Sequence, residues 1–506
     1  MSNLWQTFCA TVKAAPNQIA IIDKGQPHSF AELARRVEDF RYAYIQSGVS
    51  QYDRILLWMR NSHDMAAALV ACWGQDAIPV LIDASGRYPQ LLHAIDLVEP
   101  RVIVCPDALP GEVLDSRIAV LHAHEVSIQA NLNLPKYARA LSTDPASIVF
   151  TSGSTGFPKG VVQTHHNLER GCLSIYGYMG LRSNDILLCP VPWSFDYGYG
   201  QLLSTLLCGI THVIPSGNNP FDICEALEQQ RPTILAGTPS LFAYLMGGMS
   251  PLSSTDISSL RLLTNTGGKV PQQILDGMLN TFVDAQLILN YGLTETYRSC
   301  YLPPELLQNK SQAIGVPIPG VNIEVLRADG TRTEPFEEGE IIHRGQLVCM
   351  GYWRDKEATE VAIRGDPLAP SGLIVPSRAM FTGDIGYHDE EGIFYYVGRR
   401  DRLLKSMGVR VSPYEVEDIL LKSGLLTTVA VFGLPHDILG HEVHAAVVVR
   451  DTNTFELCAL ERYARQNMTQ YMLPRRYHLL DKLPQTTSGK TNISELEKMV
   501  HKLVQD

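Results

Sequence analysis

The stretch Ile148-Val-Phe-Thr-Ser-Gly-Ser-Thr-Gly-Phe-Pro-Lys-Gly-Val-Val-Gln-Thr-His-His-Asn167 decides how the rest of the chain is interpreted. An apolar, β-prone run enters a loop of glycines, hydroxyl residues and Lys159, and a second β run leaves it at Val161-Val-Gln-Thr. Small residues let backbone N–H groups approach a polyphosphate closely, while the hydroxyls add donors and the lysine adds positive charge. The stretch therefore predicts a phosphate-binding loop between two strands.

Two other interpretations of this loop are weaker. A Walker A loop requires Ser or Thr after its lysine and a helix after the loop, whereas Lys159 precedes Gly160 and a strand. The later Gly489-Lys490-Thr491 lacks the upstream glycine, because Pro484 stands at that position. A plain hairpin tip is the remaining alternative, but an ordinary turn rarely gathers so many phosphate-compatible residues.

Length and composition set the general class of the protein. A chain of 506 residues predicts two or more domains. Its 42 Lys and Arg against 53 Asp and Glu leave a net charge of −11, which argues against general nucleic-acid binding. The ten cysteines include no C-x-x-C pair, Met1–Lys13 lacks the order of a signal peptide, and Met65–Trp73 is too short to span a bilayer. We therefore expect a cytoplasmic protein without a nucleic-acid or membrane partner.

Hydrophobic patterns change near residue 340 and so suggest two regions. Before it, helix-period and strand-like segments alternate, which predicts α/β layering over a largely parallel sheet. After it, residues 339–351 and 381–397 are predicted to form β-hairpins, and Ser412 to cap a helix through a capping box with Glu415. We expect an α/β protein with a large N-terminal domain of layered sheets and helices, residues 1–398, and a small mobile α+β C-terminal domain, residues 399–506.

The loop Thr151-Ser-Gly-Ser-Thr-Gly-Phe-Pro-Lys-Gly160 resembles the signature loop of the adenylate-forming superfamily. That superfamily includes acyl-CoA synthetases, adenylation domains of nonribosomal peptide synthetases and beetle luciferases. The resemblance extends over roughly residues 15 to 500, with further motifs in the order that the family has them. It implies that the nucleotide phosphates lie against Thr151, Ser152, Gly153, Ser154, Thr155, Gly156 and Lys159.

Two downstream segments extend this resemblance to the nucleoside. Asn290-Tyr-Gly-Leu-Thr-Glu-Thr296 is similar to the family's Tyr-Gly-x-Thr-Glu segment, which implies that Tyr291 stacks on adenine, Thr294 contacts the α-phosphate and Glu295 holds Mg²⁺. Phe381-Thr-Gly-Asp384 resembles the family's Thr-Gly-Asp, whose carboxylate accepts from both ribose hydroxyls. Without the resemblance, Tyr291 would be interpreted as a core aromatic residue and Asp384 as part of a turn. The resemblance also assigns Gly267 and Asn290 to the nucleotide site.

The C-terminal segments supply the remaining groups that the resemblance implies. Gly398-Arg-Arg-Asp-Arg-Leu-Leu-Lys-Ser-Met-Gly408 resembles the interdomain segment, which implies that Arg399 reaches the nucleotide, Asp401 is the hinge and Gly408 lies on the loop that lines the thiol tunnel. Leu483-Pro-Gln-Thr-Thr-Ser-Gly-Lys490 resembles the catalytic loop, whose lysine bridges the attacking carboxylate and the α-phosphate. A lysine near a C-terminus is otherwise usually solvated.

The implied activity is a two-step reaction with ATP and Mg²⁺. A carboxylate attacks the α-phosphate and releases pyrophosphate, and a thiol then attacks the acyl-adenylate. Charge that builds on the phosphoryl oxygens calls for electrostatic stabilisation by Lys490, the loop donors and Mg²⁺ at Glu295. Because Lys490 and the loop with Gly408 cannot occupy the site together, the small domain is expected to swing at Asp401 between the steps.

The acid substrate is predicted from Val191-Pro-Trp-Ser-Phe-Asp-Tyr-Gly-Tyr-Gly200, which aligns with the segment that lines the acyl pocket. Asp196 stands where amino-acid-activating relatives hold the substrate's α-ammonium, and Tyr197 follows it. Arg298 aligns with another pocket position, where it could pair with Asp196, bind an acidic group of the substrate, or form a buried structural ion pair.

We therefore expect activation of a small amino acid, proline being one candidate, and transfer to the phosphopantetheine thiol of a separate carrier protein, or to coenzyme A. One alternative is an acyl-CoA or acyl-carrier-protein ligase for a non-amino acid. Another is a catalytically silent nucleotide-binding module, against which the presence of Lys159, Glu295, Asp384 and Lys490 argues.

Overall fold

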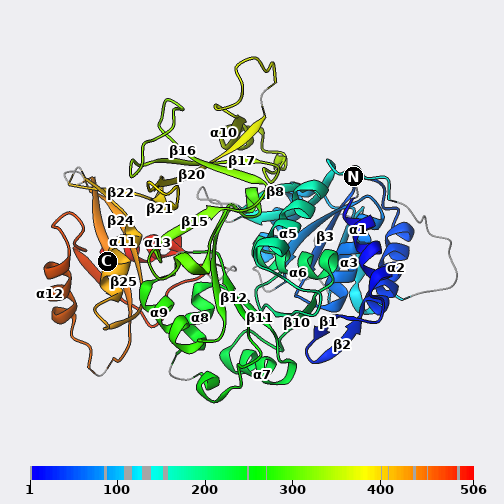
Figure 1. Cartoon of the computed structure of the whole chain (residues 1–506), viewed down its shortest axis with the longest axis horizontal. Helices are drawn as coiled ribbons and strands as arrows, with labels where there is room; N and C mark the ends of the chain where they lie inside the picture. The colour runs from blue at the N-terminus through cyan, green and yellow to red at the C-terminus, as the bar shows by residue number, and fades with distance from the viewer. Residues whose placement is uncertain are drawn as a thin grey trace.

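A computed structural model describes most of the chain. The described residues are 3–84, 88–106, 117–127, 138–151, 158–247, 250–268, 270–375, 377–400, 402–407, 409–436, 440–452, 454–486 and 490–505. Two sheets and their helices form the large N-terminal region, and a third, smaller sheet carries the C-terminal end of the chain (Figure 1). The predicted α/β fold with a large N-terminal and a small C-terminal region is confirmed.

The first sheet carries the predicted phosphate loop. Its strand order is β18-β8-β7-β4-β3-β5-β6. Strands β3 to β6 run parallel, while β7 and β8 form the antiparallel pair that was predicted on either side of the loop. The strands are β3 (Arg54–Met59), β4 (Ile78–Asp83), β5 (Val102–Cys105), β6 (Ala119–His122), β7 (Pro145–Thr151), β8 (Lys159–Thr164) and β18 (Gly351–Tyr352).

The second sheet brings the nucleoside motifs together. Its order is β16-β17-β20-β21-β15-β14-β13-β12-β11-β9-β10-β1-β2, with β19 beside β20. The strands are β1 (Ile19–Asp23), β2 (Gln26–Ser29), β9 (Ile186–Leu188), β10 (Thr211–Ile214), β11 (Ile234–Gly237), β12 (Leu262–Asn265), β13 (Gln286–Tyr291), β14 (Cys300–Leu302), β15 (Ala313–Pro317), β16 (Val321–Leu326), β17 (Gly339–Gly345), β19 (Ile363–Gly365), β20 (Arg378–His388) and β21 (Phe394–Arg399). The β20–β21 hairpin is confirmed, but β17 pairs with β16 and β20, so the predicted hairpin over 339–351 is wrong.

Helices fill the space between and around the two sheets. They are α1 (Leu4–Ala14), α2 (Phe30–Gln46), α3 (His63–Gly74), α4 (Tyr88–Val98), α5 (His165–Tyr178), α6 (Asp196–Cys208), α7 (Pro220–Gln230), α8 (Pro239–Leu245), α9 (Gln272–Thr281) and α10 (Lys356–Ala362). The apolar run Met65–Trp73 lies within α3, where all of these residues are buried in the core. Within the residues that the structure describes, no helix has the length and apolar character that crossing a bilayer requires.

Helices α5 and α6 contact each other and lie between the two sheets in Figure 1. Thr164 accepts from the backbone of Asn167 and so closes a capping box at the start of α5. Trp193, which precedes α6, and Tyr199, which belongs to it, are fully buried in the core together with residues of both sheets. The two sheets therefore share one core, and the segment 191–200 is held rigidly within it.

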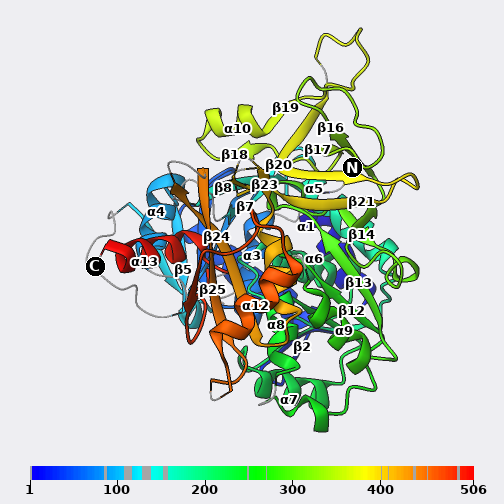
Figure 2. The ribbon, with the colours of Figure 1, turned by 90° about the vertical axis from the view of Figure 1, so that its left-hand side faces the viewer.

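The C-terminal region forms its own sheet and core, seen edge-on with α13 in Figure 2. Its elements are β22 (Leu404–Ser406), β23 (Val409–Val411), α11 (Pro413–Leu421), β24 (Leu426–His436), β25 (Gly440–Val449), α12 (Leu457–Asn467), β26 (Arg476–Leu479) and α13 (Ile493–Gln505). Ser412 is the N-cap of α11, as predicted, but the predicted capping box is wrong. The Ser412 hydroxyl instead donates to the Val397 carbonyl at 2.7 Å, because β21 lies beside the start of the helix.

Candidate active site

The two strands that flank the phosphate loop place its ends side by side. Thr151 at the end of β7 pairs with Lys159 at the start of β8. The loop residues Ser152, Gly153, Ser154, Thr155 and Gly156 lie outside the described residues. The Lys159 ammonium lies 3.7 Å from the Asp355 carboxylate and 5.2 Å from the centre of the Tyr352 ring. The ammonium of Lys159, at the end of the loop, is therefore positioned by the Asp355 carboxylate and by a cation–π contact with Tyr352.

Tyr352 links this lysine to the predicted metal-binding carboxylate. Glu295 lies in the short 3₁₀ turn Thr294–Thr296 that follows β13, and its Oε1 accepts from the Tyr352 hydroxyl at 2.6 Å. The Thr294 carbonyl accepts from Gln163 of β8 at 2.6 Å, which fixes the turn against the loop strand. A buried carboxylate on a turn fixed to the strand that follows the predicted phosphate loop fits Mg²⁺, which takes one or two carboxylates together with substrate phosphates.

Asp384 on β20 is the centre of the predicted ribose site. The Tyr291 hydroxyl donates to its Oδ2 at 2.5 Å, and the Arg399 guanidinium lies 3.3 Å from its Oδ1. Burial raises the pKa of Asp384 to about 6, against the lowering effects of the Arg399 charge and the Tyr291 hydrogen bond. Among the described residues, none donates a well-oriented hydrogen bond to Oδ1. Since Oδ1 has an ion pair but no oriented hydrogen bond from the described residues, it is suited to accept from the hydroxyl groups of a ligand.

The Asn290 and Gly267 positions differ in character. Asn290 donates to Thr264 Oγ1 at 2.8 Å and to the Asn265 carbonyl at 3.0 Å, so its side chain ties β13 to β12. Gly267 follows β12 with a φ of +94°, a conformation that favours glycine. A Cβ atom at Gly267 would lie 3.6 Å from the Cε atom of Lys490.

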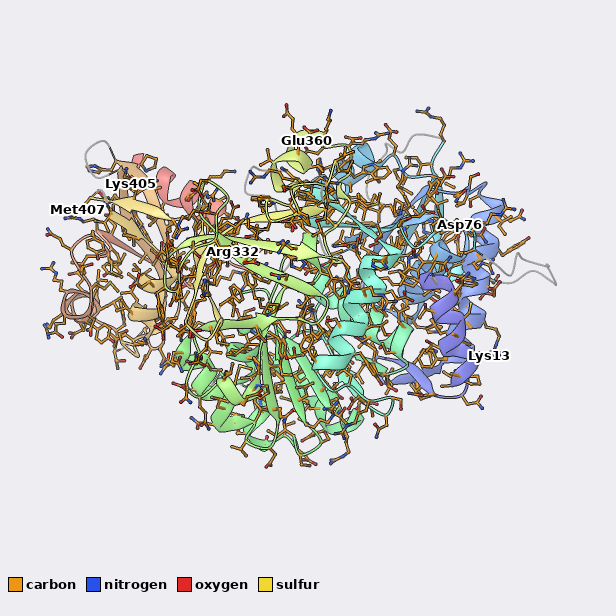
Figure 3. All side chains as sticks on the ribbon, turned by 45° about the horizontal axis from the view of Figure 1, so that its top comes forward. Lys13, Asp76, Arg332, Glu360, Lys405 and Met407 are labelled. Carbon is orange, nitrogen blue, oxygen red and sulfur yellow. The ribbon has the colours of Figure 1, made fainter. Side chains whose placement is uncertain are left out.

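Lys490 therefore reaches the large region from the small one. The Thr486 N–H donates to the Lys490 carbonyl at 2.7 Å, and a bridge between Gln485 and Thr491 closes the loop that carries the lysine. In Figure 3, Lys405 and Met407 lie at the outer end of the C-terminal sheet. The predicted hinge Asp401 and tunnel residue Gly408 lie outside the described residues.

The predicted acyl pocket contains two charged residues that do not pair. Asp196 is half-buried at the first position of α6, while Arg298 is 2% exposed. No ion pair joins them in the described part of the chain, so the buried structural ion pair considered from the sequence is wrong. The Arg298 guanidinium instead lies 4.9 Å from the centre of the Tyr197 ring. The Tyr197 hydroxyl donates to the Thr264 carbonyl at 2.8 Å, so its ring forms a fixed wall.

Tyr297 closes the space beside this arginine. Its φ of 59° and ψ of −55° are unusual for a bulky residue, and the Arg298 N–H donates to the Thr296 carbonyl at 2.5 Å across a tight γ-turn. Such a conformation costs about 1–3 kcal/mol and persists where surrounding packing enforces it. Here a Cβ at Gly171 of α5 would overlap the Tyr297 ring, and one at Gly200 of α6 would lie 3.0 Å from its hydroxyl. Tyr297 thus fills the gap between the two helices.

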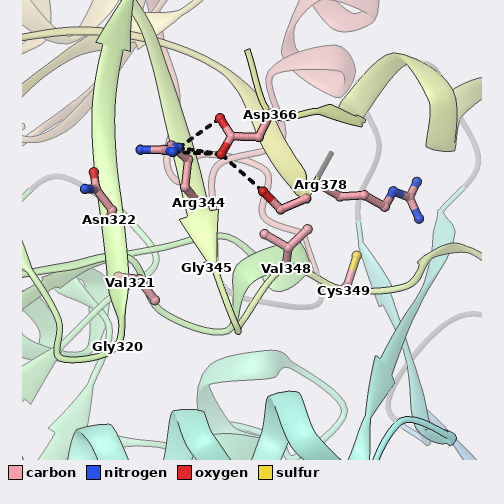
Figure 4. Close-up of a pocket in the computed structure, with 10 residues that line it drawn as sticks. Gly320, Val321, Asn322, Arg344, Gly345, Val348, Cys349, Asp366 and Arg378 are labelled. Carbon is pink, nitrogen blue, oxygen red and sulfur yellow. Dashed lines mark hydrogen bonds and ion pairs between the residues drawn. The ribbon is translucent and has the colours of Figure 1, made fainter. Parts of the chain in front are cut away.

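A separate cavity of about 580 Å³ lies beside β16 and β17 (Figure 4). It is lined by Gly320, Val321, Asn322, Arg344, Gly345, Val348, Cys349, Asp366, Ser377 and Arg378. The Arg344 guanidinium lies 2.8 Å from the Asp366 carboxylate, so these two charges are already paired. None of the lining residues is a site residue predicted from the sequence.

Sequence reasoning missed Tyr352 and Tyr297. Tyr352 lies on β18, which follows Glu295 by more than fifty positions in the chain and joins the sheet of β8. Tyr297 directly follows the Thr-Glu-Thr segment, but a tyrosine gives no signal of a positive φ. The adjacency of Tyr297 to Arg298 was the one available hint, because both follow a segment already assigned to the site.

Comparisons with known proteins identify the family to which the chain is similar. The profile of the AMP-binding enzymes matches residues 8–353, and that of the AMP-binding enzyme C-terminal domain matches residues 415–490. A 2-succinylbenzoate–CoA ligase of Geobacillus kaustophilus is 27% identical over 491 residues, covering 97% of this chain and 96% of that protein. An indoleacetate–CoA ligase of Aromatoleum aromaticum is 28% identical over 502 residues, covering 96% of each.

Solved structures show the same fold. The o-succinylbenzoate CoA synthetase of Bacillus subtilis in complex with its acyl-adenylate intermediate superposes with a TM-score of 0.85 at 24% identity, covering 98% of both chains. The same enzyme in complex with ATP and a magnesium ion gives a TM-score of 0.86 at 24% identity, covering 98% of this chain and 99% of that one. At this identity the likeness concerns the fold.

Proposed function

Since this chain belongs to the family of AMP-binding enzymes and is an AMP-forming ligase, we propose that it joins a compact, non-amino carboxylic acid to coenzyme A. The acid first becomes an acyl-adenylate with release of pyrophosphate, and the thiol of coenzyme A then displaces AMP. ATP and magnesium are the cofactors of this chemistry.

This proposal differs from the expectation from the sequence in both the thiol acceptor and the class of acid. The curated relatives that align over nearly the whole chain are named as CoA ligases, which favours coenzyme A over a carrier protein. The amino-acid interpretation depended on Asp196, which is only half-buried, whereas the relatives are named for 2-succinylbenzoate and indoleacetate, neither of which is an amino acid. The acyl-CoA ligase alternative is therefore the better supported one.

The approach of Lys490 to Gly267 is the observation that carries the proposal. It places a cation from the C-terminal region beside the segment after β12, on the side where Glu295 and Asp384 also lie near β13. Lys490 would neutralise the carboxylate as it attacks and the phosphoryl oxygens that gain charge, while bound Mg²⁺ would add electrostatic stabilisation at the phosphates.

The remaining roles follow from the same site. Asp384 accepts the ribose hydroxyls through Oδ1, which receives no hydrogen bond from the described residues. Tyr291 stacks its ring on the adenine. Thr294 and the loop from Thr151 to Lys159 contact phosphate. Domains of residues 1–398 and 399–506, with a hinge at Asp401, let Gly408 replace Lys490 after the adenylate has formed. The outward position of Met407, 44% exposed while Lys490 reaches Gly267, supports such an alternation.

An ATP–pyrophosphate exchange panel tests the proposal. Purified full-length enzyme is assayed with amino acids, including proline, and with aromatic and short aliphatic acids, and each active acid is then incubated with coenzyme A. We expect exchange with a non-amino acid and a coenzyme A thioester detected by mass spectrometry. Exchange with amino acids alone, or adenylate without any coenzyme A thioester, would contradict the proposal.

A further inference from the structure

Arg298 is a buried cation that has no counter-charge among the residues that the structure describes. It is 2% exposed, and its Nε atom has no hydrogen-bond partner within the same residues. Within the described ranges, no carboxylate lies within 4.0 Å of its guanidinium. Removing a charge from water without pairing it is strongly unfavourable, so buried charges in proteins are normally paired or bind a ligand. The surroundings of Arg298 decide between a structural and a ligand-binding role.

Three tyrosines surround the guanidinium, and none can neutralise it. Burial raises the pKa of Tyr178, Tyr197 and Tyr297, and the nearby charge of Arg298 acts in the opposite direction on each. All three phenols are therefore neutral at physiological pH. The Tyr178 hydroxyl donates to Asn290 at 2.5 Å and the Tyr197 hydroxyl to the Thr264 carbonyl, so both are already committed as donors. The tyrosines orient the arginine without supplying an anion.

The position of Arg298 connects it to the reacting end of the site. It follows Glu295 by three residues, and the tight turn at Tyr297 directs the chain between them. Its guanidinium lies over Tyr197, the second residue of α6, beside the segment aligned with the acyl pocket. Because Tyr297 fills the gap between Gly171 and Gly200, it limits the room beside the arginine, which favours a compact acyl group in the predicted pocket.

We propose that the acid activated by this enzyme is a compact dicarboxylic acid, whose second carboxylate pairs with Arg298. This inference rests on the proposed function and narrows its substrate class. Arginine suits such a role because its planar guanidinium binds a carboxylate through two parallel hydrogen bonds and stays charged when buried. Pairing with the distal carboxylate would supply the missing counter-charge and fix the other carboxylate toward the nucleotide.

Length-matched acids test the inference on the unmodified enzyme. Pairs such as pentanoate with glutarate, hexanoate with adipate, and benzoate with phthalate differ mainly in the second carboxylate, and 2-succinylbenzoate extends the series. We expect a diacid to exceed its monoacid partner in kcat/KM for pyrophosphate exchange by about a hundredfold or more, because an unfilled arginine site rejects the analogue that lacks its partner. Monoacids that react as well as or better than every diacid would overturn the inference.

Two variants separate substrate recognition from a structural role. Arg298→Met removes the charge and retains an unbranched, flexible apolar side chain, and Arg298→Lys retains a charge without the planar fork. We expect Met to abolish the diacid preference while exchange with monoacids persists, and Lys to restore it in part. Equal loss of activity toward both acid classes would indicate a role in the reaction step or the fold and would overturn the inference.

Two further measurements do not depend on turnover. Calorimetric titration of each acid pair into enzyme with AMP should show tighter binding of a diacid, lost in Arg298→Met. If no acid supports pyrophosphate exchange but a diacid still binds more tightly than its monoacid partner, the proposed function is wrong and the inference about Arg298 is supported. Because an unpaired buried charge opposes folding, Arg298→Met should leave the melting temperature of the ligand-free enzyme unchanged or higher. A melting temperature lower by more than about 2 °C would show that the ring contact is structural.

Discussion

Replacing Asp384 with asparagine should stabilise the protein and weaken nucleotide binding. Burial raises the pKa of this carboxyl from 3.8 to about 6, so the folded protein binds the proton more tightly than the unfolded chain does. The ionised carboxylate therefore destabilises the fold above pH 6, and this cost decreases as the pH falls toward 4. Asparagine is isosteric and keeps an oxygen acceptor for the Tyr291 hydroxyl, but it carries no charge.

The size of the effect follows from the two pKa values. At about 1.4 kcal/mol per pKa unit, a rise from 3.8 to about 6 corresponds to roughly 3 kcal/mol. The unfolding entropy is ~2.1 cal/mol/K per residue, and the large N-terminal region that contains Asp384 has about 400 residues. Dividing the free energy by this total entropy gives a rise in melting temperature of about 4 °C. Loss of charge-assisted bonds to two ribose hydroxyls, each worth about 1.5–3 kcal/mol, weakens ATP binding by at least tenfold.

Differential scanning calorimetry from pH 4.5 to 8 and titration with ATP at pH 7.5 measure both effects. The melting-temperature difference between Asp384→Asn and the wild type should grow between pH 4.5 and 6 and then level off. Glu391→Gln, an exposed carboxylate on the β20–β21 turn, is the matched control and should change neither quantity by a comparable amount. If Asp384→Asn had a lower melting temperature than the wild type and the same ATP affinity, two conclusions would be refuted: that Asp384 accepts from the ribose, and that its charge destabilises the fold.

Two more substitutions test the other groups of the site. Lys490→Ala should reduce pyrophosphate exchange about a hundredfold or more, since such a group contributes roughly 3 kcal/mol, while coenzyme A thioester formation from supplied acyl-adenylate is largely kept. The exposed Lys482→Ala is its control, and equal loss of both steps would contradict the role. Tyr352→Phe removes the 2.6 Å hydrogen bond to Glu295 and should raise the Mg²⁺ concentration for half-maximal exchange about tenfold. The control is Tyr387→Phe, at a tyrosine of β20 that stacks on Tyr395. A Mg²⁺ dependence of Tyr352→Phe equal to that of this control would show that the hydrogen bond does not position Glu295.

Much of the local structure could be predicted because near neighbours determine it. The strand–loop–strand around residues 148–164 follows from β-prone runs on either side of glycines. The N-cap at Ser412 was also predictable, but its capping box was not. The hydroxyl of Ser412 has a competing acceptor at Val397 that lies fifteen positions earlier in the chain.

The sequence predicted that distant motifs share one site, but it did not predict which of their side chains are in contact. Asp384 and Tyr291 are 93 positions apart, and the strand order β20-β21-β15-β14-β13 brings them into a hydrogen bond. Tyr352 reaches Glu295 only because β18 adds to the edge of the sheet that carries β8. Neither contact has a pattern along the chain, because strand neighbours are selected by the packing of whole sheets.

By itself, the sequence of this protein determined its family, its division into a large and a small region, and the chemical types in the predicted nucleotide site. These properties reside in short segments whose residue types are dictated by backbone geometry and by phosphate chemistry. The tertiary structure alone decided that Asp196 and Arg298 remain unpaired and that Tyr297 closes the space between α5 and α6. Whether opposite charges meet depends on distances set by packing in three dimensions, and residue order does not contain those distances.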